Sequence, residues 1–332
     1  MSDALFQAYF SLFLWIGLGV LCYRLLPHQL PHWLGRGLFW VGMPVEIFTL
    51  ARHTDFSGLV WLAPAATVST LVIGLSLAFG LLQLHRQGFL QSLGSASEPS
   101  LSLYPESDPD GLGATLNLPQ QGSFMLSSIL GNTGFVGLAI ASKVLSPENL
   151  GVAAFFTVMH NVMGLYGVGV LVSHHFGEST ADRRWWKSLL AVVKVPSLWA
   201  FVLGVATQPI LFTPRIESWL SQSVWVVIPC GFLLMGMRLS QIKNWHDLTS
   251  GLVPTLVKMV LMPTTIAIAT SLLGIVGEPR LALVLMAGTP TALTTLVLAE
   301  EYNLDRSLIS SSIALSMLAL IPMVPLWVKL LH

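Results

Sequence analysis

Long apolar stretches alternate along the chain with short clusters of charged, proline and glycine residues. A helix needs about 20 apolar residues to cross the hydrocarbon core of a bilayer, and these stretches have that length. The pattern therefore predicts an all-α polytopic membrane protein with ten transmembrane helices. The expected helices cover residues 5–25, 33–51, 58–84, 122–145, 150–174, 187–208, 216–238, 249–274, 280–299 and 307–331.

The connections between the expected helices are short, except for residues 85–121. This segment is rich in Ser, Pro, Gly, Asp and Glu and lacks helical periodicity, so we expect a flexible loop. Because no other connection has room for a soluble domain or a nucleotide-binding cassette, an ATP-driven pump is disfavoured. The first apolar stretch has no basic segment before it and no cleavage site after it, so we interpret it as a mature helix and not as a signal peptide.

Composition and charge agree with a membrane location. Hydrophobic residues make up 54% of the chain and charged residues 10%, whereas a soluble domain has roughly 25% charged residues. The formal net charge is zero, which gives no electrostatic reason to expect a nucleic-acid partner. If both termini lie outside the plasma (inner) membrane, nine Lys and Arg residues fall on the inner side and five on the outer side. Such an excess inside is typical of membrane proteins, so we predict this orientation.

Two sequence motifs recur at an offset of 185 residues. Leu-Gly-Val at residues 18–20 returns at residues 203–205, and a Trp-Val motif that ends in Pro44 returns as one that ends in Pro229. Both prolines are expected to break the helices that contain them. Chance similarity in a sequence rich in Leu, Val and Gly is the alternative explanation.

The offset divides the chain into two repeats of five helices, residues 1–176 and residues 177–332. Because five is an odd number, the second repeat must cross the membrane in the opposite sense, which makes the repeat inverted. Secondary transporters are often built in this way and hold their substrate near the membrane midplane, between discontinuous helices of the two repeats.

Polar and flexible residues interrupt the fourth and ninth expected helices at corresponding positions. Proline and glycine open the backbone there, and exposed N–H groups beside Asn and Thr side chains are suited to holding a carboxylate. We therefore expect both helices to be broken crossover helices that form the substrate site. The candidate substrate-binding residues are Gly131, Asn132, Thr133, Gly134, Thr289, Pro290 and Thr291. The alternative is a pair of plain kinks packed against small neighbouring residues.

Three ionisable residues fall inside apolar stretches and are candidates for coupling or charge balance. Glu46 is costly in a bilayer unless it is paired, protonated or facing water, so it is either a proton or cation carrier or a helix-end residue near the interface. Lys258 either balances an anionic substrate or an internal carboxylate, or extends its amine to the membrane surface. His160 either titrates near neutral pH or satisfies a neighbouring carbonyl.

Catalytic and cofactor-binding motifs are absent from the sequence. There is no nucleophile elbow, H-E-x-x-H motif or phosphate-binding loop. Cys22 and Cys230 lie in apolar stretches without the spacing of a metal site or a redox pair. We therefore predict no enzymatic activity, no cofactor and no metal.

Two of these segments resemble known signatures. Residues 131–138 resemble the fourth-helix signature of the auxin efflux carrier family, and residues 289–303 resemble its ninth-helix signature. The family includes plant PIN-type carriers and bacterial organic-anion permeases. The resemblance implies a scaffold domain and a transport domain, an elevator-like exchange of an anionic substrate, and homodimerisation through the scaffold. It also implies that Asn132, Thr133 and residues 289–291 form the pocket where helices four and nine cross.

These observations together predict a secondary transporter of a small organic anion, auxin-like or another carboxylate. Its partners would be this substrate and the lipid bilayer, and the sequence leaves open coupling to protons, coupling to sodium, or uniport. Two alternatives remain at this stage. One is a sodium-coupled carrier of the bile-acid or bicarbonate type, and the other is a non-transporting membrane receptor with the carrier fold.

Overall fold

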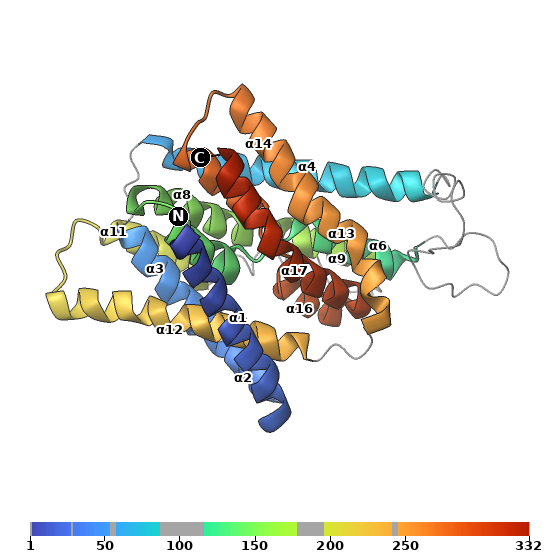
Figure 1. The fold of residues 1–332 in the computed structure, drawn as a ribbon, viewed down its shortest axis with the longest axis horizontal. Coiled ribbons are helices and arrows are strands. Elements are labelled where there is room, and N and C mark those ends of the chain that lie inside the picture. Colours follow the sequence, from blue (N-terminus) through green and yellow to red (C-terminus); the bar gives the residue numbers. More distant parts are fainter. Residues whose placement is uncertain are drawn as a thin grey trace.

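The structure is a computed structural model that describes residues 2–27, 29–53, 58–86, 116–177, 196–240 and 245–331. All regular secondary structure in these residues is helical (Figure 1). Five helices are long and apolar enough to cross a membrane, namely Leu62–Leu84, Glu148–Phe176, Pro214–Leu239, Leu248–Leu272 and Arg306–Leu331. Shorter apolar helices cover Tyr9–Leu25, Thr133–Val144 and Pro196–Ala206. The prediction of an all-helical, multi-pass membrane protein is thus confirmed, whereas the number of ten spans stays a prediction.

Several spans are made of consecutive helical segments. The first part of the chain contains α1 (Ser2–Leu25), α2 (Leu30–Gly37), the π-helical η1 (Leu38–Gly42), α3 (Met43–His53), the 3₁₀ turn η2 (Gly58–Trp61) and α4 (Leu62–Arg86). The next part contains α6 (Leu118–Ile129), the π-helical η3 (Thr133–Gly137), α7 (Leu138–Val144), α8 (Pro147–Met159), the π-helical η4 (His160–Gly169) and α9 (Val170–Phe176).

The second half of the chain contains further helices of the same kinds. They are α11 (Pro196–Ala206), α12 (Pro214–Leu239), the 3₁₀-helical η5 (Trp245–Gly251), α13 (Leu252–Leu256), the π-helical η6 (Val257–Leu261), α14 (Met262–Leu272), α15 (Glu278–Ala287), α16 (Thr294–Tyr302) and α17 (Arg306–Leu331).

The structure corrects both ends of the loop predicted at residues 85–121, because each flanking helix extends into it. Helix α4 continues through Arg86, and α6 begins at Leu118. A capping box fixes this start: the Gln120 N–H donates to the Asn117 side chain (2.9 Å), and the Asn117 N–H donates to the Gln120 side chain (3.1 Å). This reciprocal pair satisfies N–H groups that the first turn would otherwise leave without a partner. Residues 87–115 lie outside the described residues, as do residues 187–195 of the expected sixth span.

Neither Pro44 nor Pro229 ends a helix, which corrects the expectation of breaks at these positions. Pro44 is the second residue of α3 and follows the π-helical turn η1, so α2, η1 and α3 form one continuous helical stretch. Helix α12 runs through Pro229 without interruption. A proline removes only one hydrogen bond from a helix, and in membrane helices local π turns and neighbouring helices compensate for that loss.

The helices form two groups (Figure 1). The first helix group consists of α1, α2, α3, α11 and α12, in which α1 packs on α12 and α11 packs on α3. The second helix group consists of α4, α6, α9 and α13 to α17, in which α17 packs on α6 and α13. Segments η3 and α8 contact members of both groups, and α7 contacts η3, α8 and α1 of the first helix group.

Glycines allow the closest helix contacts within the first helix group. A Cβ atom on Gly19 of α1 would lie 3.0 Å from the Gly236 Cα of α12. A Cβ atom on Gly204 of α11 would lie 2.8 Å from the Ala51 Cβ of α3. The sequence offset of 185 residues relates Gly19 to Gly204 and also relates Ala51 to Gly236. One offset therefore relates two helix contacts as well as two motifs, while the division of the chain into residues 1–176 and 177–332 stays a prediction.

The two groups meet at a small apolar cluster, which we name the junction cluster. Its members are Leu34, Leu38, Phe135, Val227, Cys230, Leu234 and Leu293. Most of them belong to the first helix group, but Phe135 lies in η3 and Leu293 directly precedes α16. The cluster thus places the first helix group against the polar segments that interrupt the fourth and ninth expected helices.

Candidate functional site

Both polar segments predicted to interrupt helices lie between helical ends in the structure. Helix α6 ends at Ile129 and η3 begins at Thr133, whereas α15 ends at Ala287 and α16 begins at Thr294. At the first interruption Leu130 has extended backbone angles, with φ −83° and ψ 115°. The helical hydrogen-bond pattern therefore stops and resumes at each of these places.

The two interrupted segments are hydrogen-bonded to each other. Gly131 and Thr291 form an isolated antiparallel bridge. The Asn132 N–H donates to the Pro290 carbonyl (2.7 Å), and the Ala292 N–H donates to the Leu130 carbonyl (2.9 Å). These bonds replace helical hydrogen bonds that the interruptions remove, which matters where no water can reach the backbone. We name this paired region, residues 130–132 and 288–293, the crossing.

The side chains on the α15 side of the crossing are bonded within the protein. The Thr289 hydroxyl donates to the Met286 carbonyl (3.0 Å), and the Thr291 hydroxyl donates to the Ser127 carbonyl (3.0 Å). The Thr291 N–H donates to the Ser316 hydroxyl oxygen (3.0 Å). Thr291 therefore ties the interrupted segment to two helices, α6 and α17, and so has a clear structural role.

The side chains on the α6 side of the crossing are less fully bonded. Asn132 is 6% exposed, and its Oδ1 accepts a long hydrogen bond from the Phe135 N–H (3.3 Å). Its amide nitrogen Nδ2 and the hydroxyl of Thr133 are buried without a hydrogen-bond partner. Buried polar atoms of this kind are normally satisfied, because desolvation without a hydrogen bond is costly. Two polar groups at the crossing thus have no hydrogen-bond partner within the protein.

Lys258 extends into the crossing and not to the membrane surface. It belongs to η6, is fully buried, and donates a hydrogen bond from Nζ to the Ala287 carbonyl at the end of α15 (2.7 Å). A Cβ atom on Gly131 would lie 2.8 Å from this Nζ, so glycine leaves the space that the amine fills. Within the described ranges, ion pairs join Arg52 and His53 to Glu217, and none involves Lys258.

The other two candidate ionisable residues lie differently. His160 is buried in η4, stacks on the Phe156 ring with centroids 5.9 Å apart, and lies within electrostatic reach of Lys258. Its Nε2 has no hydrogen-bond partner. Glu46 is buried in α3, and its Oε1 also lacks a partner. His160 is thus electrostatically coupled to Lys258, whereas no hydrogen bond or ion pair of the described residues joins Glu46 to Lys258 or to Asn132.

A cavity of about 430 Å³, which we name the wide cavity, opens beside the crossing. Phe135, Leu293 and Thr294 line it at the interrupted segments. Its other walls combine aromatic and charged side chains from both helix groups. These include His32, Arg36, Phe39, Trp40, Tyr166, Arg238, Glu300 and Glu301. The cavity thus combines apolar and aromatic walls with both cationic and anionic side chains.

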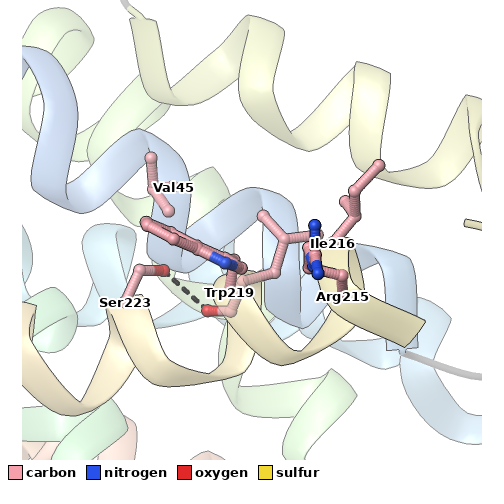
Figure 2. Close-up of a pocket in the computed structure, with 6 residues that line it drawn as sticks. Val45, Arg215, Ile216, Trp219 and Ser223 are labelled. Atoms are coloured by element: carbon pink, nitrogen blue, oxygen red, sulfur yellow. Dashed lines mark hydrogen bonds between the residues drawn. The ribbon is translucent and has the colours of Figure 1, made fainter. Parts of the chain in front are cut away.

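A smaller cavity of about 280 Å³, which we name the narrow cavity, lies between α1, α7 and α12. The Lys143 amine lies 4.7 Å from the centroid of the Trp225 ring within it. A third hollow of about 460 Å³ lies along α12 beside α3 (Figure 2). Figure 2 shows Arg215, Ile216 and Trp219 around it, and none of its lining residues belongs to the crossing. We therefore do not assign the third hollow to the substrate.

The sequence did not single out the walls of these cavities. Arg36, Arg238 and Tyr166 come from distant segments and have no motif in common. Phe135 lies next to the candidate residues 131–134, and its position directly after them was the one local signal. Within the described ranges, no group of three or more His, Cys, Asp or Glu side chains is placed to share a metal ion.

Comparisons with known proteins agree with this geometry. A family model described as "Membrane transport protein" matches residues 114–328, a range that includes the whole crossing. An uncharacterized transporter of Methanothermobacter thermautotrophicus is 26% identical over 298 residues, which cover 89% of this chain and 87% of the relative. An uncharacterized transporter of Methanocaldococcus jannaschii is 27% identical over 212 residues, which cover 62% of this chain and 67% of the relative. The chain belongs to this family of membrane transport proteins, the auxin efflux carrier family.

Proposed function

We propose that the protein is a secondary transporter of a small organic anion, which binds at the crossing. The observation that carries this proposal is the buried amine of Lys258, which lies beside Gly131 and has no carboxylate partner among the described residues. A buried charge is costly unless it is paired. An anionic substrate would supply the missing partner.

The groups around Lys258 suit a carboxylate. The Asn132 amide and the Thr133 hydroxyl are buried and unpaired. Together with the amine they offer hydrogen-bond donors to the two oxygens of one carboxylate, and hydrogen bonds to charged groups are stronger than those between neutral groups. The candidate substrate-binding residues Gly131, Thr289 and Pro290 would then shape the backbone around the bound group.

The wide cavity suits the remainder of such a substrate. It reaches the crossing at Phe135 and Leu293 and has aromatic walls at Phe39, Trp40 and Tyr166. Ligand pockets typically combine apolar walls with a few polar groups that fix orientation. The proposed substrate is therefore a carboxylate with an apolar or aromatic body, as in auxin-like compounds.

In the proposed mechanism the second helix group moves against the first helix group, which acts as the scaffold. Binding at the crossing would alternate between the two sides of the membrane without ATP, as in other carriers with discontinuous helices. Homodimerisation through the first helix group is part of the same proposal. So are the inverted repeat of residues 1–176 and 177–332 and the placement of both termini outside the plasma (inner) membrane.

A thermal-shift screen of the purified protein provides the first test. Small carboxylates, including indole-3-acetate, benzoate and succinate, would be added with and without sodium. Ligand that binds the folded state raises the apparent melting temperature by mass action. We expect stabilisation by at least one of these anions, and a shift that needs sodium would favour a sodium-coupled carrier. No shift with any carboxylate would contradict the proposed substrate class.

Asn132→Ala tests the site itself. This variant is expected to lose carboxylate binding while keeping most of its stability, because the side chain makes only one long hydrogen bond and such bonds contribute about 1 kcal/mol. Binding would be measured by isothermal titration calorimetry and folding by size-exclusion chromatography.

Asn149→Ala provides the matched control. It removes two hydrogen bonds of Nδ2, to Ser146 and Glu278 (both 3.0 Å), at a place remote from the crossing. We expect this variant to bind normally. If Asn132→Ala binds as well as Asn149→Ala does, the assignment of the pocket is wrong.

A further inference from the structure

The wide cavity borders the junction cluster, and the narrow cavity lies next to the cluster along α12. Phe135, Leu234 and Leu293 belong to the cluster and also line the wide cavity. On α12, Ile228 and Pro229 line the narrow cavity and lie between the cluster members Val227 and Cys230 in sequence. The cluster is therefore in contact with the wide cavity and adjacent in sequence to residues that line the narrow one.

The two cavities lie at different positions along the contact between α12 and the η3–α7 segment, as the order of their lining residues shows. On α12, residues from Ser221 to Phe232 line the narrow cavity, and the wide cavity begins at Leu234. With a rise of 1.5 Å per residue, the two sets of α12 residues are centred about 14 Å apart. On the opposite wall the order is reversed, because Phe135 lines the wide cavity and Lys143 lines the narrow one.

The two walls make a close contact where the ring of Phe135 packs on Gly231. A Cβ atom on Gly231 would lie 2.6 Å from Cδ1 and 2.8 Å from Cγ of Phe135, so the ring packs directly on the α12 backbone. A similar contact lies one residue earlier, where a Cβ atom on Gly134 would lie 2.8 Å from Cε of Met43. At both places a large side chain of one element covers a glycine of the other.

We infer that Phe135, packed on Gly231, is the gate residue that closes the transport path between the wide and narrow cavities. Phe135 is near the crossing in sequence and donates its N–H to the Asn132 side chain, so movement of the site moves the ring. The apolar cluster around it excludes water while the ring is in place. This inference rests on the proposed transport function, because a barrier between two cavities has a purpose only if solute passes.

The first test uses Cys230, a native member of the junction cluster, as a reporter. In a Cys22→Ser background, Cys230 is the remaining thiol. A charged, membrane-impermeant methanethiosulfonate reagent reacts with thiolates in contact with water, not with thiols sealed in apolar surroundings. Phe135→Ala is expected to speed the labelling of Cys230 by about tenfold or more, because water then enters the cluster.

Phe79→Ala provides the matched control for labelling. Phe79 is 53% exposed on α4 and lies outside the junction cluster, so its loss should leave the labelling rate unchanged. Size-exclusion chromatography would verify that both variants remain folded. If Phe135→Ala and Phe79→Ala label Cys230 at the same rate, the ring does not seal the cluster and the inference is overturned. This result needs no substrate, so it is independent of the proposed function.

A second test measures flux with the gate tightened. Gly231→Ala adds a methyl group against the Phe135 ring, and we expect uptake of radiolabelled indole-3-acetate or benzoate into proteoliposomes to fall by about tenfold. Gly37→Ala makes the same change where nothing lies within 4 Å, and it should leave uptake unchanged. The double variant Gly231→Ala with Phe135→Ala should recover uptake relative to Gly231→Ala.

The outcomes of the flux test separate the two proposals. If the unmodified protein takes up neither probe, the proposed function is contradicted. The labelling test then decides by itself whether the Phe135 ring seals the junction cluster. Normal uptake by the unmodified protein, together with equal uptake by Gly231→Ala and Gly37→Ala, would overturn the gate. Failure of Phe135→Ala to restore uptake in the double variant would overturn it too, because the defect would then have another cause.

Discussion

Lys258 shows how much one residue determines at the candidate site. Its amine donates to the carbonyl end of α15, where a cation is favoured by the helix dipole. That bond leaves the positive charge itself without an anionic partner among the described residues. His160 lies within electrostatic reach of this amine. In the proposed function, a substrate anion would pair with the protonated amine.

Lys258→Met should weaken carboxylate binding by about tenfold to a hundredfold. A hydrogen bond to a charged group contributes about 1.5–3 kcal/mol, and each 1.4 kcal/mol corresponds to a factor of ten in affinity. Titration calorimetry with the carboxylate found in the thermal-shift screen would measure the change. Lys329→Met is the control, because Lys329 lies exposed in the last turn of α17. Equal losses in both variants would mean that overall charge, and not this amine, determines affinity.

Glu46 allows a separate prediction about coupling. Its carboxyl group is buried in α3 with one oxygen unpaired, and a buried carboxylate is favoured in its protonated form when no cation balances it. If it carries the coupled proton, uptake by the unmodified protein depends on pH and uptake by Glu46→Gln does not. Glu148→Gln, which changes an exposed carboxylate of α8, should retain the pH dependence. Uptake that is indifferent to pH and to Glu46→Gln would exclude this role.

The identity of the special residues was predictable from sequence, but their surroundings were not. Lys258, His160 and Glu46 are each conspicuous because an ionisable side chain interrupts an apolar stretch. Whether the amine of Lys258 reaches the membrane surface or the protein interior depends on Gly131, which is distant in sequence. For the same reason the sequence could not show that His160 lies within electrostatic reach of Lys258.

At the scale of helices, the contact between α1 and α12 determines how the first helix group packs. Gly19 brings the two backbones together, since a Cβ atom there would meet the Leu233 carbonyl oxygen and the Gly236 Cα. Backbone atoms cannot move aside as a side chain does. The contact is therefore intolerant of any added atom.

Gly19→Ala should destabilise the protein by about 1–3 kcal/mol, the usual cost of overpacking. Gly17→Ala is an unusually close control, because Gly17 lies in the same helix and a Cβ atom there would have nothing within 4 Å. Melting temperatures of the two purified variants in the same detergent would make the comparison. Equal melting temperatures would show that α1 and α12 do not need this close approach.

The existence of the helices was predictable because their apolar length is a local property. Their interruptions were predictable at residues 131–134 and 289–291, where glycine or proline occurs with polar side chains. A proline alone was not a sufficient signal: α12 passes through Pro229, where the flanking residues are apolar and helical. Helix α6 begins four residues before the predicted start because a capping box at Asn117 stabilises its first turn.

At the scale of the whole molecule, the sequence did not predict which distant segments pair with each other in space. An offset of 157 residues relates Gly-Asn-Thr at residues 131–133 to Gly-Thr-Pro at residues 288–290, so Gly131 corresponds to Gly288 in the second repeat. The structure instead pairs Gly131 with Thr291. The residue that corresponds to Gly131 in the second repeat is therefore not the residue that lies next to it in space. Neither the junction cluster nor the two cavities has a sequence signature, since each combines residues from both halves of the chain.

Orientation in the membrane is a testable property of the whole chain. The excess of Lys and Arg in the loops assigned to the inner side predicts that both termini lie outside. Protease-cleavable tags at the two ends should be cut in right-side-out vesicles and protected in inside-out vesicles. Tags on opposite sides would require an odd number of spans and would exclude an inverted repeat of five helices each.

The paired backbone at the crossing has a consequence for how the protein must be made. The Asn132 N–H finds its acceptor on Pro290, and the Ala292 N–H finds its acceptor on Leu130, so each portion of the polypeptide completes the other. Inside the bilayer no water is available to form a hydrogen bond with an unpaired peptide group. Folding of the amino-terminal portion can therefore be completed only after residues 288–293 have been synthesised. Fragments expressed alone should be degraded, and coexpressed fragments should assemble.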